Sequence, residues 1–175
     1  MNRERKPMPG LMLLMLLMPL APGSGWTSTP DDGRHTEHAA PAPPPTSRGQ
    51  VLLPSGRLLE VEVADTPEAR QRGYMFREKV SDTEGMIFMM EEVGFHPFWM
   101  KNCKVALDIL WLDDRWQVVH LERNLPPCEK DPCPSYPPMQ ASLYVLETQA
   151  GLAAREGIKL GDHIIYTPPR PRPRR

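Results

Sequence analysis

The chain has 175 residues, which is the usual size of one domain with tails. Its formal net charge of -1 gives no support for binding nucleic acid through a basic face. Proline is enriched, with 22 residues in the chain against an average share of about 5%. Because the prolines gather outside the middle of the chain, we expect the folded part to be shorter than the whole.

The N-terminus has the pattern of a secretory signal, which we assign to residues 1–25. Basic residues precede an apolar run from Leu11 to Leu20, and small residues follow up to Gly25. The run is shorter than the about 20 residues that a spanning helix needs. The sequence therefore predicts an exported protein, periplasmic or secreted, which is held at a membrane only if this segment is not cleaved.

Two further segments lack the apolar residues of a core. Residues 26–49 are rich in proline, serine and threonine, and they predict a disordered linker, in which His35 and His38 are expected to be solvated. Residues 168–175 form a basic Pro/Arg tail, which offers too few phosphate contacts to predict a nucleic-acid partner. The folded domain is thus expected over residues 50–167.

The domain opens with a predicted hairpin and a short helix. Residues 58–63 alternate apolar and acidic side chains, and a Pro-Ser-Gly turn separates them from residues 51–53. Thr66 has the chemistry of a helix N-cap, Pro67 suits the first helical position, and Gly73 is typical of the residue that ends a helix.

The remaining elements predict a β-rich domain. Strands are expected at 85–90, 98–104, 107–112, 116–121, 142–147 and 163–166, with a second short helix at 148–156. Residues 107–112 are apolar on both faces apart from Asp108, which indicates a central strand covered on both sides. Because strands do not alternate with long helices, the pattern predicts a mainly β (α+β) fold. It would be a small antiparallel β-barrel or sandwich with two short helices in the connections.

Five stretches together resemble a known family. They are Arg72-Gly73-Tyr74-Met75-Phe76-Arg77, Glu84-Gly85-Met86-Ile87-Phe88, Phe98-Trp99-Met100-Lys101-Asn102 with Leu107-Asp108, Tyr144-Val145-Leu146-Glu147, and Gly157-Ile158-Lys159-Leu160-Gly161-Asp162. Over roughly residues 50 to 167 the chain resembles the domain of unknown function 192 family. The resemblance implies a compact, mainly β fold in an often secreted or membrane-tethered protein, and no established activity. Tyr74, Cys103 and Ala106 depart from the residues common in that family, namely Leu, Thr and Pro.

The three cysteines divide into a pair and a single residue. Cys128 and Cys133 lie close together between prolines, and in an exported protein they predict a disulfide. Two free thiols or a metal pair are the alternative. Cys103 lies among large apolar residues, where a buried and inert thiol is expected more often than a nucleophile.

The polar residues of the central segment are the candidate binding site. Lys101, Asn102 and Asp108 predict a pocket for a polar ligand, with Met100 and Trp111 as apolar walls. Arg77 and Glu147 are further candidate ligand-binding residues. The alternative is a structural ion pair of Asp108 with Lys101 or Arg77, because a buried carboxylate needs a partner.

Three functions remain open on the sequence. The first is an exported, non-catalytic binding module without a cofactor, which binds a small polar ligand or a component of the cell envelope. The second is a cell-envelope hydrolase that uses Asp108 and Glu147 as its acid and base. The third is a periplasmic metal-handling protein, suggested by five methionines near His96 and Cys103, namely Met75, Met86, Met89, Met90 and Met100. Core packing explains the methionines more simply, and we predict no metal site.

Overall fold

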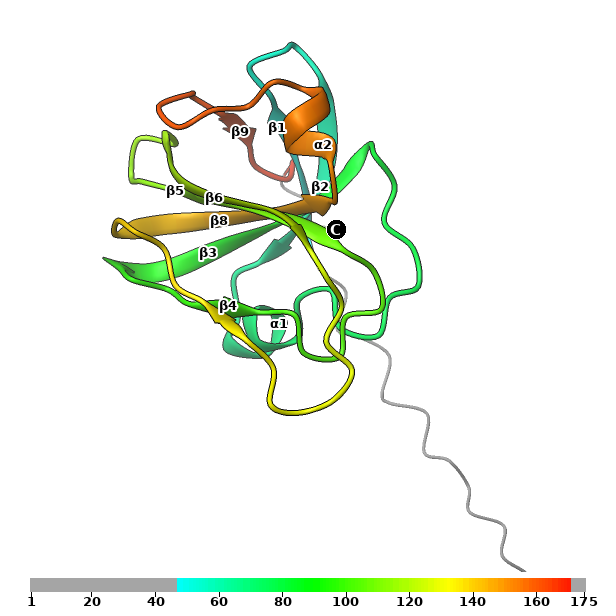
Figure 1. Cartoon of the computed structure of the whole chain (residues 1–175). Coiled ribbons are helices and arrows are strands. Elements are labelled where there is room, and N and C mark those ends of the chain that lie inside the picture. Colours follow the sequence, from blue (N-terminus) through cyan, green and yellow to red (C-terminus); the bar gives the residue numbers. More distant parts are fainter. Residues whose placement is uncertain (1–46, 171–175) are drawn as a thin grey trace, which may run out of the picture. The chain divides into compact units, whose positions relative to one another are not determined.

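The computed structural model describes residues 47–170, so the predicted signal segment and most of the predicted linker and tail lie outside the described residues. Nine strands and two short helices occur in this range (Figure 1). In chain order they are β1 (Arg48–Leu52), β2 (Leu58–Ala64), α1 (Pro67–Arg72), β3 (Glu84–Gly94), β4 (Phe98–Trp99), β5 (Leu107–Leu112), β6 (Val118–Leu125), β7 (Ser135–Tyr136), β8 (Ser142–Gln149), α2 (Leu152–Arg155) and β9 (Ile165–Thr167). The mainly β prediction is confirmed. Strand β1 begins at Arg48, within the segment predicted to be linker.

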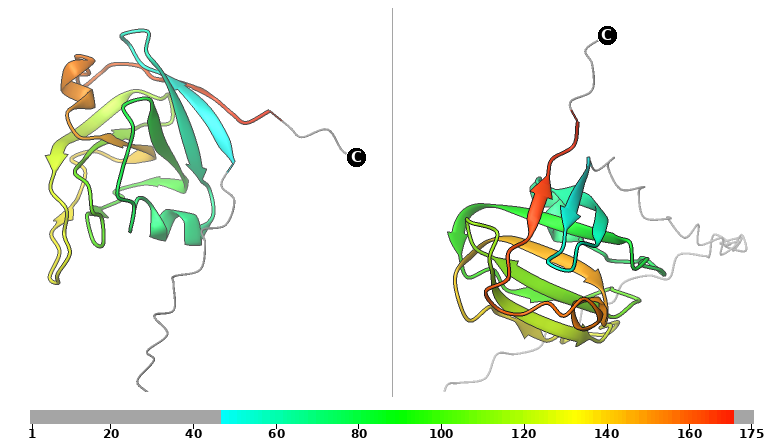
Figure 2. Two further views of the ribbon diagram at one scale, coloured as in Figure 1. Left: turned by 90° about the vertical axis from the view of Figure 1, so that its right-hand side faces the viewer. Right: turned by 90° about the horizontal axis from the view of Figure 1, so that it is seen from above.

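Seven strands form one curved sheet in the order β6-β5-β8-β3-β2-β1-β9, and β4 pairs with β7 in a small second sheet (Figures 1 and 2). The large sheet is mixed, because β2 and β3 run parallel while its other neighbours are antiparallel. This corrects the expectation of a purely antiparallel sheet. Parallel strands need a crossover connection, and here α1 and the loop after it connect the end of β2 to the start of β3.

The two edges of the large sheet approach each other. An isolated bridge joins Gln117, just before β6, to His163, just before β9. The backbone N–H of Val118 donates to the carbonyl of Asp162 at 2.8 Å, and that of Ile164 donates to the carbonyl of Trp116 at 3.0 Å. No closed barrel is found within residues 47–170, and the architecture is sandwich-like.

Apolar residues pack on both faces of the sheet. The first core includes Leu59, Val61, Ile87, Leu110, Leu112, Leu146 and Leu152, and the second core includes Tyr74, Met86, Phe88, Met100, Cys103, Leu107, Ile109, Trp111 and Val145. Strand β5 supplies both cores with alternate side chains, and all six of its residues are buried. This confirms the prediction that residues 107–112 form a central strand covered on both faces.

Helix α1 forms as its local sequence predicts. The Thr66 hydroxyl accepts a hydrogen bond from the Ala69 N–H at 3.2 Å, and Pro67 is the first helical residue. Gly73 ends the helix at a φ of 46°, in the region that favours glycine. Neither helix within residues 47–170 has the length and apolarity needed to cross a membrane.

The prediction of a strand over residues 98–104 holds for its first two residues and is wrong for the rest. Strand β4 ends at Trp99, and Asn102 takes a positive φ of 57° that ends any extended run. The loop is instead joined to the segment around Cys128. The Asn102 N–H donates to the Cys128 carbonyl at 2.9 Å, and the Cys128 N–H donates to the Met100 carbonyl at 3.1 Å. Lys101, Asn102 and Cys103 therefore lie in a loop beside the small second sheet.

Candidate functional site

A buried carboxyl on β8 is the most unusual group in the second core. Glu147 is 3% exposed, and its Oε2 atom has no hydrogen-bond partner among the described residues. Burial raises the pKa of this carboxyl to about 8, which the charge of Arg77 partly opposes. A carboxyl without donors and away from water is more stable in its protonated form. Burial therefore favours the neutral, protonated form of Glu147.

Glu147 lines a small cavity beside the C-terminal end of α1. This inner cavity has a volume of about 30 Å³, which is enough to hold a water molecule. Its lining residues are Arg70, Gln71, Arg72, Gly73, Tyr74, Met75, Phe88, Phe98, Trp99, Lys101, Cys103 and Glu147. The cavity thus has a polar base within an apolar and partly cationic wall.

A larger apolar groove adjoins the inner cavity. It measures about 320 Å³ and shares five lining residues with the cavity, which are Arg70, Gln71, Phe88, Phe98 and Trp99. Met90, His96 and Pro97 complete it. This volume is near the lower end of the range for small-molecule sites.

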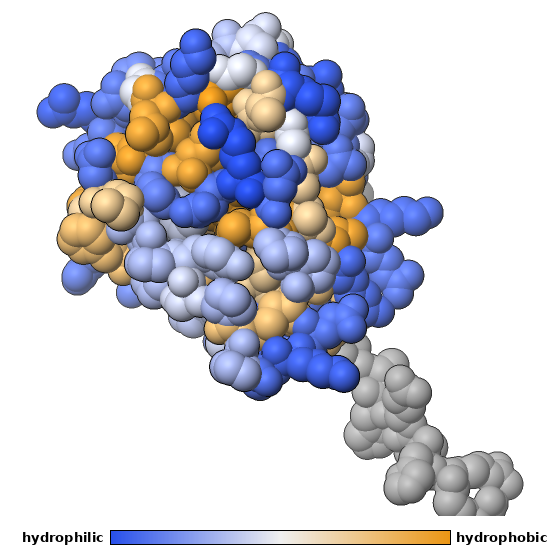
Figure 3. All heavy atoms as spheres, viewed as in Figure 1, coloured by the Kyte–Doolittle hydropathy of each residue, from blue (hydrophilic) through white to orange (hydrophobic). Residues whose placement is uncertain are grey.

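The groove lies close to an exposed apolar end of β3. Val93 is 58% exposed, and Phe95, just beyond the strand, is 66% exposed. On the face shown in Figure 3, hydrophobic residues form an orange patch at the edge where Figure 1 places this end of β3. The groove residues His96 and Pro97 follow directly in the chain.

Gly73 makes room for the inner cavity. A Cβ atom at this position would lie 3.3 Å from the Phe88 ring and 3.5 Å from Glu147 Oε2. Its positive φ also disfavours any larger residue. Glycine at the end of α1 thus serves both the helix terminus and the space beside the buried carboxyl.

Aromatic packing holds the wall of the cavity in place. The rings of Phe88 and Phe98 meet edge to face with centroids 4.9 Å apart, and Phe98 meets Trp111 in the same way at 5.8 Å. The Trp111 indole N–H donates to the His96 carbonyl at 2.8 Å. These contacts fix the short β4 segment, and with it one wall of both the cavity and the groove.

Tyr74 and Cys103 keep their protons at the base of the cavity. Burial first, and the nearby Glu147 second, raise the pKa of the Cys103 thiol to about 12. The same two causes raise the pKa of Tyr74 well above its ordinary value. Cys103 is consequently a poor nucleophile at neutral pH, because the thiolate is the reactive form.

Cationic side chains line the mouth, and their acidic partners lie outside it. Lys101 Nζ is 2.7 Å from Asp131 Oδ2, and it also lies 5.4 Å from the centre of the Trp99 ring. Arg70 pairs with Glu91. The side chains of Asp131 and Glu91 are 64% and 77% exposed, and neither residue lines the cavity or the groove.

Asp108 lies apart from this site, although we expected it beside Lys101 and Asn102. Its two carboxylate oxygens accept hydrogen bonds from the backbone N–H groups of Asn124 (2.8 Å), Gly151 (3.0 Å) and Ala153 (2.8 Å). It therefore joins the end of β6 to the turn that opens α2. Neither cavity described above includes Asp108 among its lining residues.

The ion pairs considered for Asp108 are not formed either. Lys101 pairs with Asp131, and Arg77 makes a two-pronged pair with Glu62 in which both N···O distances are 2.6 Å. Backbone N–H groups satisfy the Asp108 charge in place of a cation.

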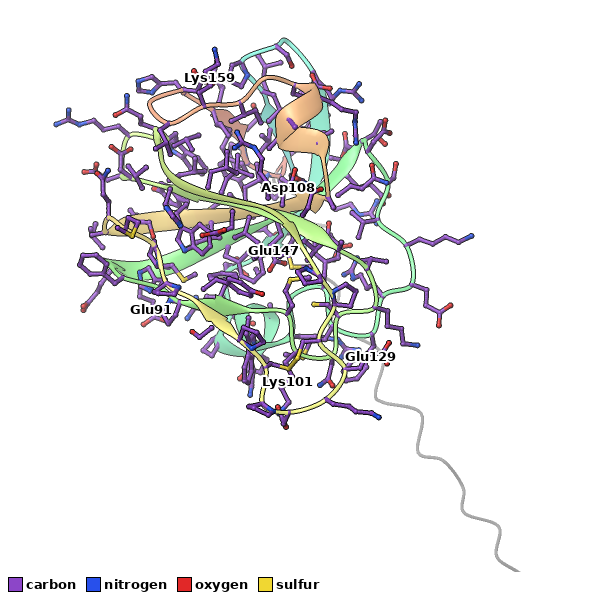
Figure 4. The ribbon with its side chains drawn as sticks, viewed as in Figure 1. Glu91, Lys101, Asp108, Glu129, Glu147 and Lys159 are labelled. Atoms are coloured by element: carbon purple, nitrogen blue, oxygen red, sulfur yellow. A yellow bond between two sulfur atoms is a disulfide. The ribbon has the colours of Figure 1, made fainter. Side chains whose placement is uncertain are left out.

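The structure places Asp108 and Glu147 on opposite faces of the sheet. In the pairing of β5 with β8, Glu147 lies opposite Ile109 of the second core, whereas Asp108 lies opposite Thr148. Successive side chains of a strand point to opposite faces, so Asp108 points away from the second core. Figure 4 shows Asp108 on the α2 side of β8, with Glu147 and Lys101 on the other side. The two carboxyls cannot act together on one substrate.

The other predicted residues fall into different places. Met100 is fully buried in the second core, and the Asn102 amide donates to the Met75 sulfur at 3.9 Å. The predicted Cys128–Cys133 disulfide is present and Cys103 is a free, buried thiol. Such a disulfide is compatible with an exported protein. Within residues 47–170, no cluster of three or more His, Cys, Asp or Glu residues could hold a metal ion.

Several cavity residues were not among those predicted from the sequence. Gly73, Tyr74, Phe98 and Trp99 belong to the stretches on which the family resemblance depends, and that was the one available signal. Of the predicted site residues, Lys101 and Glu147 are the two that line the inner cavity.

Comparisons with known proteins agree with the resemblance seen in the sequence. Residues 51–166 match the model of the DUF192 family, described as uncharacterized ACR. A crystal structure of a protein of unknown function from Novosphingobium aromaticivorans DSM 12444 is 35% identical, with a TM-score of 0.62, covering 74% of this chain and 94% of that one. A candidate transcription regulator from Sinorhizobium meliloti 1021 is 29% identical, with a TM-score of 0.61, covering 70% and 94%. The search of curated proteins returned no match. The chain belongs to the DUF192 family of uncharacterized proteins.

Proposed function

We propose that this protein is an exported, non-catalytic binding module that holds a small ligand in the inner cavity and the apolar groove. Glu147 forms the base of the site, and Lys101 lies at its mouth. The proposal keeps the binding function expected from the sequence but moves its centre from Asp108 to Glu147.

The observation that carries the proposal is the unpartnered Oε2 of Glu147. Leaving a buried polar atom without a hydrogen bond costs about 1–3 kcal/mol, so packing alone would favour an apolar residue here. The atom borders a cavity that Gly73 keeps open, next to a groove walled by aromatic side chains. A group that weakens the fold while facing a cavity is a typical feature of a binding site.

Binding is favoured over catalysis by the chemistry of the cavity. The pKa values of Tyr74 and Cys103 are raised, so neither is an activated nucleophile. The inner cavity has one carboxyl and no histidine among its lining residues. A two-carboxylate hydrolase needs a second acid on the same face of the sheet, and Asp108 lies on the other face.

The activity suggested for the Sinorhizobium relative does not carry over to this chain. A transcription regulator that contacts DNA needs a basic surface, and the formal net charge here is -1. Export is supported instead by the basic and apolar pattern of the N-terminus and by the Cys128–Cys133 bond.

The experiment is a fragment screen followed by NMR on the isotope-labelled protein, with the Trp99 indole as the reporter. Trp99 lines both spaces, whereas Trp116 packs against the first core and is the internal control. We expect fragments that shift the Trp99 signal and leave Trp116 unchanged.

The matched variant is Glu147→Leu. It should raise the melting temperature, because the unpartnered carboxyl is gone, and it should abolish the fragment shifts at Trp99. If the variant is less stable and still binds every fragment, Glu147 is a structural residue and the proposal fails.

A further inference from the structure

We propose that the ligand is a small organic acid with an aryl or alkyl body, whose carboxylate enters the inner cavity while its body lies in the apolar groove. This inference rests on the proposed function and names the chemical class of the ligand. Three features of the site carry it, namely the hydrogen-bonding base, the charge at the mouth and the apolar wall.

The base of the cavity presents donors to a ligand. Glu147 Oε2 is buried and unpartnered, and no described side chain neutralises a charge on it by a hydrogen bond. A carboxyl in such surroundings is protonated, so its O–H is available to donate. The Cys103 thiol, which also lines the cavity, keeps its proton as well. A carboxylate is acceptor-only and matches such a base.

The charge at the mouth favours an anion. The cations Arg70, Arg72 and Lys101 line the inner cavity, and Glu147 is its one acidic residue. The acidic partners of Arg70 and Lys101 lie in solvent, where a surface ion pair contributes at most about 1 kcal/mol. A ligand carboxylate can therefore replace Asp131 as the partner of Lys101 at little cost in free energy.

The groove sets the body of the ligand. Phe88, Met90, Pro97, Phe98 and Trp99 form an apolar wall around about 320 Å³. The inner cavity of about 30 Å³ admits only a terminal group. A ligand that fills both spaces has one small polar end and one apolar body, such as a phenyl ring on a short stem.

The titratable groups that face Glu147 determine how pH acts on binding. They are Arg70, Arg72 and Tyr74 at the end of α1, Lys101 and Cys103 in the loop after β4, and Arg77 after the next turn. The pKa of Glu147 is about 8, so this carboxyl changes from mostly neutral to mostly charged on going from about pH 6 to about pH 9. Its ionisation would repel an anion and attract a cation.

The test compares three probes with one phenyl ring each: phenylacetate, phenethyl alcohol and phenethylamine. Binding is measured by calorimetry and by the shift of the Trp99 indole signal. We expect phenylacetate to bind best at about pH 6 and to bind about tenfold more weakly at about pH 9, since about one tenth of Glu147 is then protonated. In Glu147→Gln the amide still donates, so binding persists and this pH dependence disappears.

Lys101→Met provides the matched test of charge. It should weaken phenylacetate about five- to tenfold and leave phenethyl alcohol unchanged. If phenethylamine binds better than phenylacetate, and increasingly so at higher pH, the ligand class is wrong while the binding function stands. If no probe of any charge shifts Trp99 and Glu147→Leu alters no fragment signal, both proposals fail.

Discussion

Glu147→Gln should change how stability depends on pH. The native pKa of this carboxyl is about 8, against an ordinary value of 4.5. The folded protein therefore binds a proton between these values that the unfolded chain has released, and stability falls as the pH rises. Linkage predicts a loss of about 4 kcal/mol in the free energy of unfolding from about pH 5 to about pH 8.5. The amide of Glu147→Gln does not titrate, so this contribution disappears in the variant.

The measurement is a series of urea unfolding curves at several pH values for the wild type and the variant. The difference between the two curves isolates Glu147, because all other groups titrate in both proteins. Glu92→Gln is the matched control, since Glu92 is exposed on β3, and it should follow the wild type. The reasoning is refuted if the free energies of unfolding of the wild type and of Glu147→Gln change in parallel from about pH 5 to about pH 8.5. In that case the carboxyl does not hold a proton in the folded state.

Three further predictions concern the rest of the domain. Asp108→Asn should lower the free energy of unfolding by about 3 kcal/mol, because the three backbone N–H groups then have one acceptor oxygen in place of two. Adding Lys101→Met should not restore the denaturation midpoint, whereas recovery would mean that the two residues form an ion pair. In the native protein without reductant, an alkylating agent followed by mass spectrometry should find no modified cysteine, and after unfolding it should modify Cys103 alone. Residues 47–170 produced alone should unfold in one cooperative transition by calorimetry, because both apolar cores are formed within them.

Short-range chemistry in the sequence was enough to predict much of the fold. Helix α1 follows from Thr66, Pro67 and Gly73, which act within a few residues of one another. The continuous apolar run of β5 predicts a strand covered on both faces. The nearness of Cys128 and Cys133 predicts their bond. Each of these features depends on neighbours along the chain.

The site depended on contacts that the sequence does not contain. Successive side chains of a strand point to opposite faces of the sheet. When both faces are apolar, this rule does not tell which of the two cores a given side chain enters. Asp108 was therefore predicted beside Lys101, although its three donors belong to residues 16, 43 and 45 positions further along the chain. The sequence placed Asp108 in the apolar run of a covered strand and Glu147 at the end of another predicted strand. Only tertiary packing decided that Asp108 meets three backbone donors while Glu147 Oε2 meets none, because the donors come from the end of β6 and the start of α2, which the fold brings to one face of the sheet.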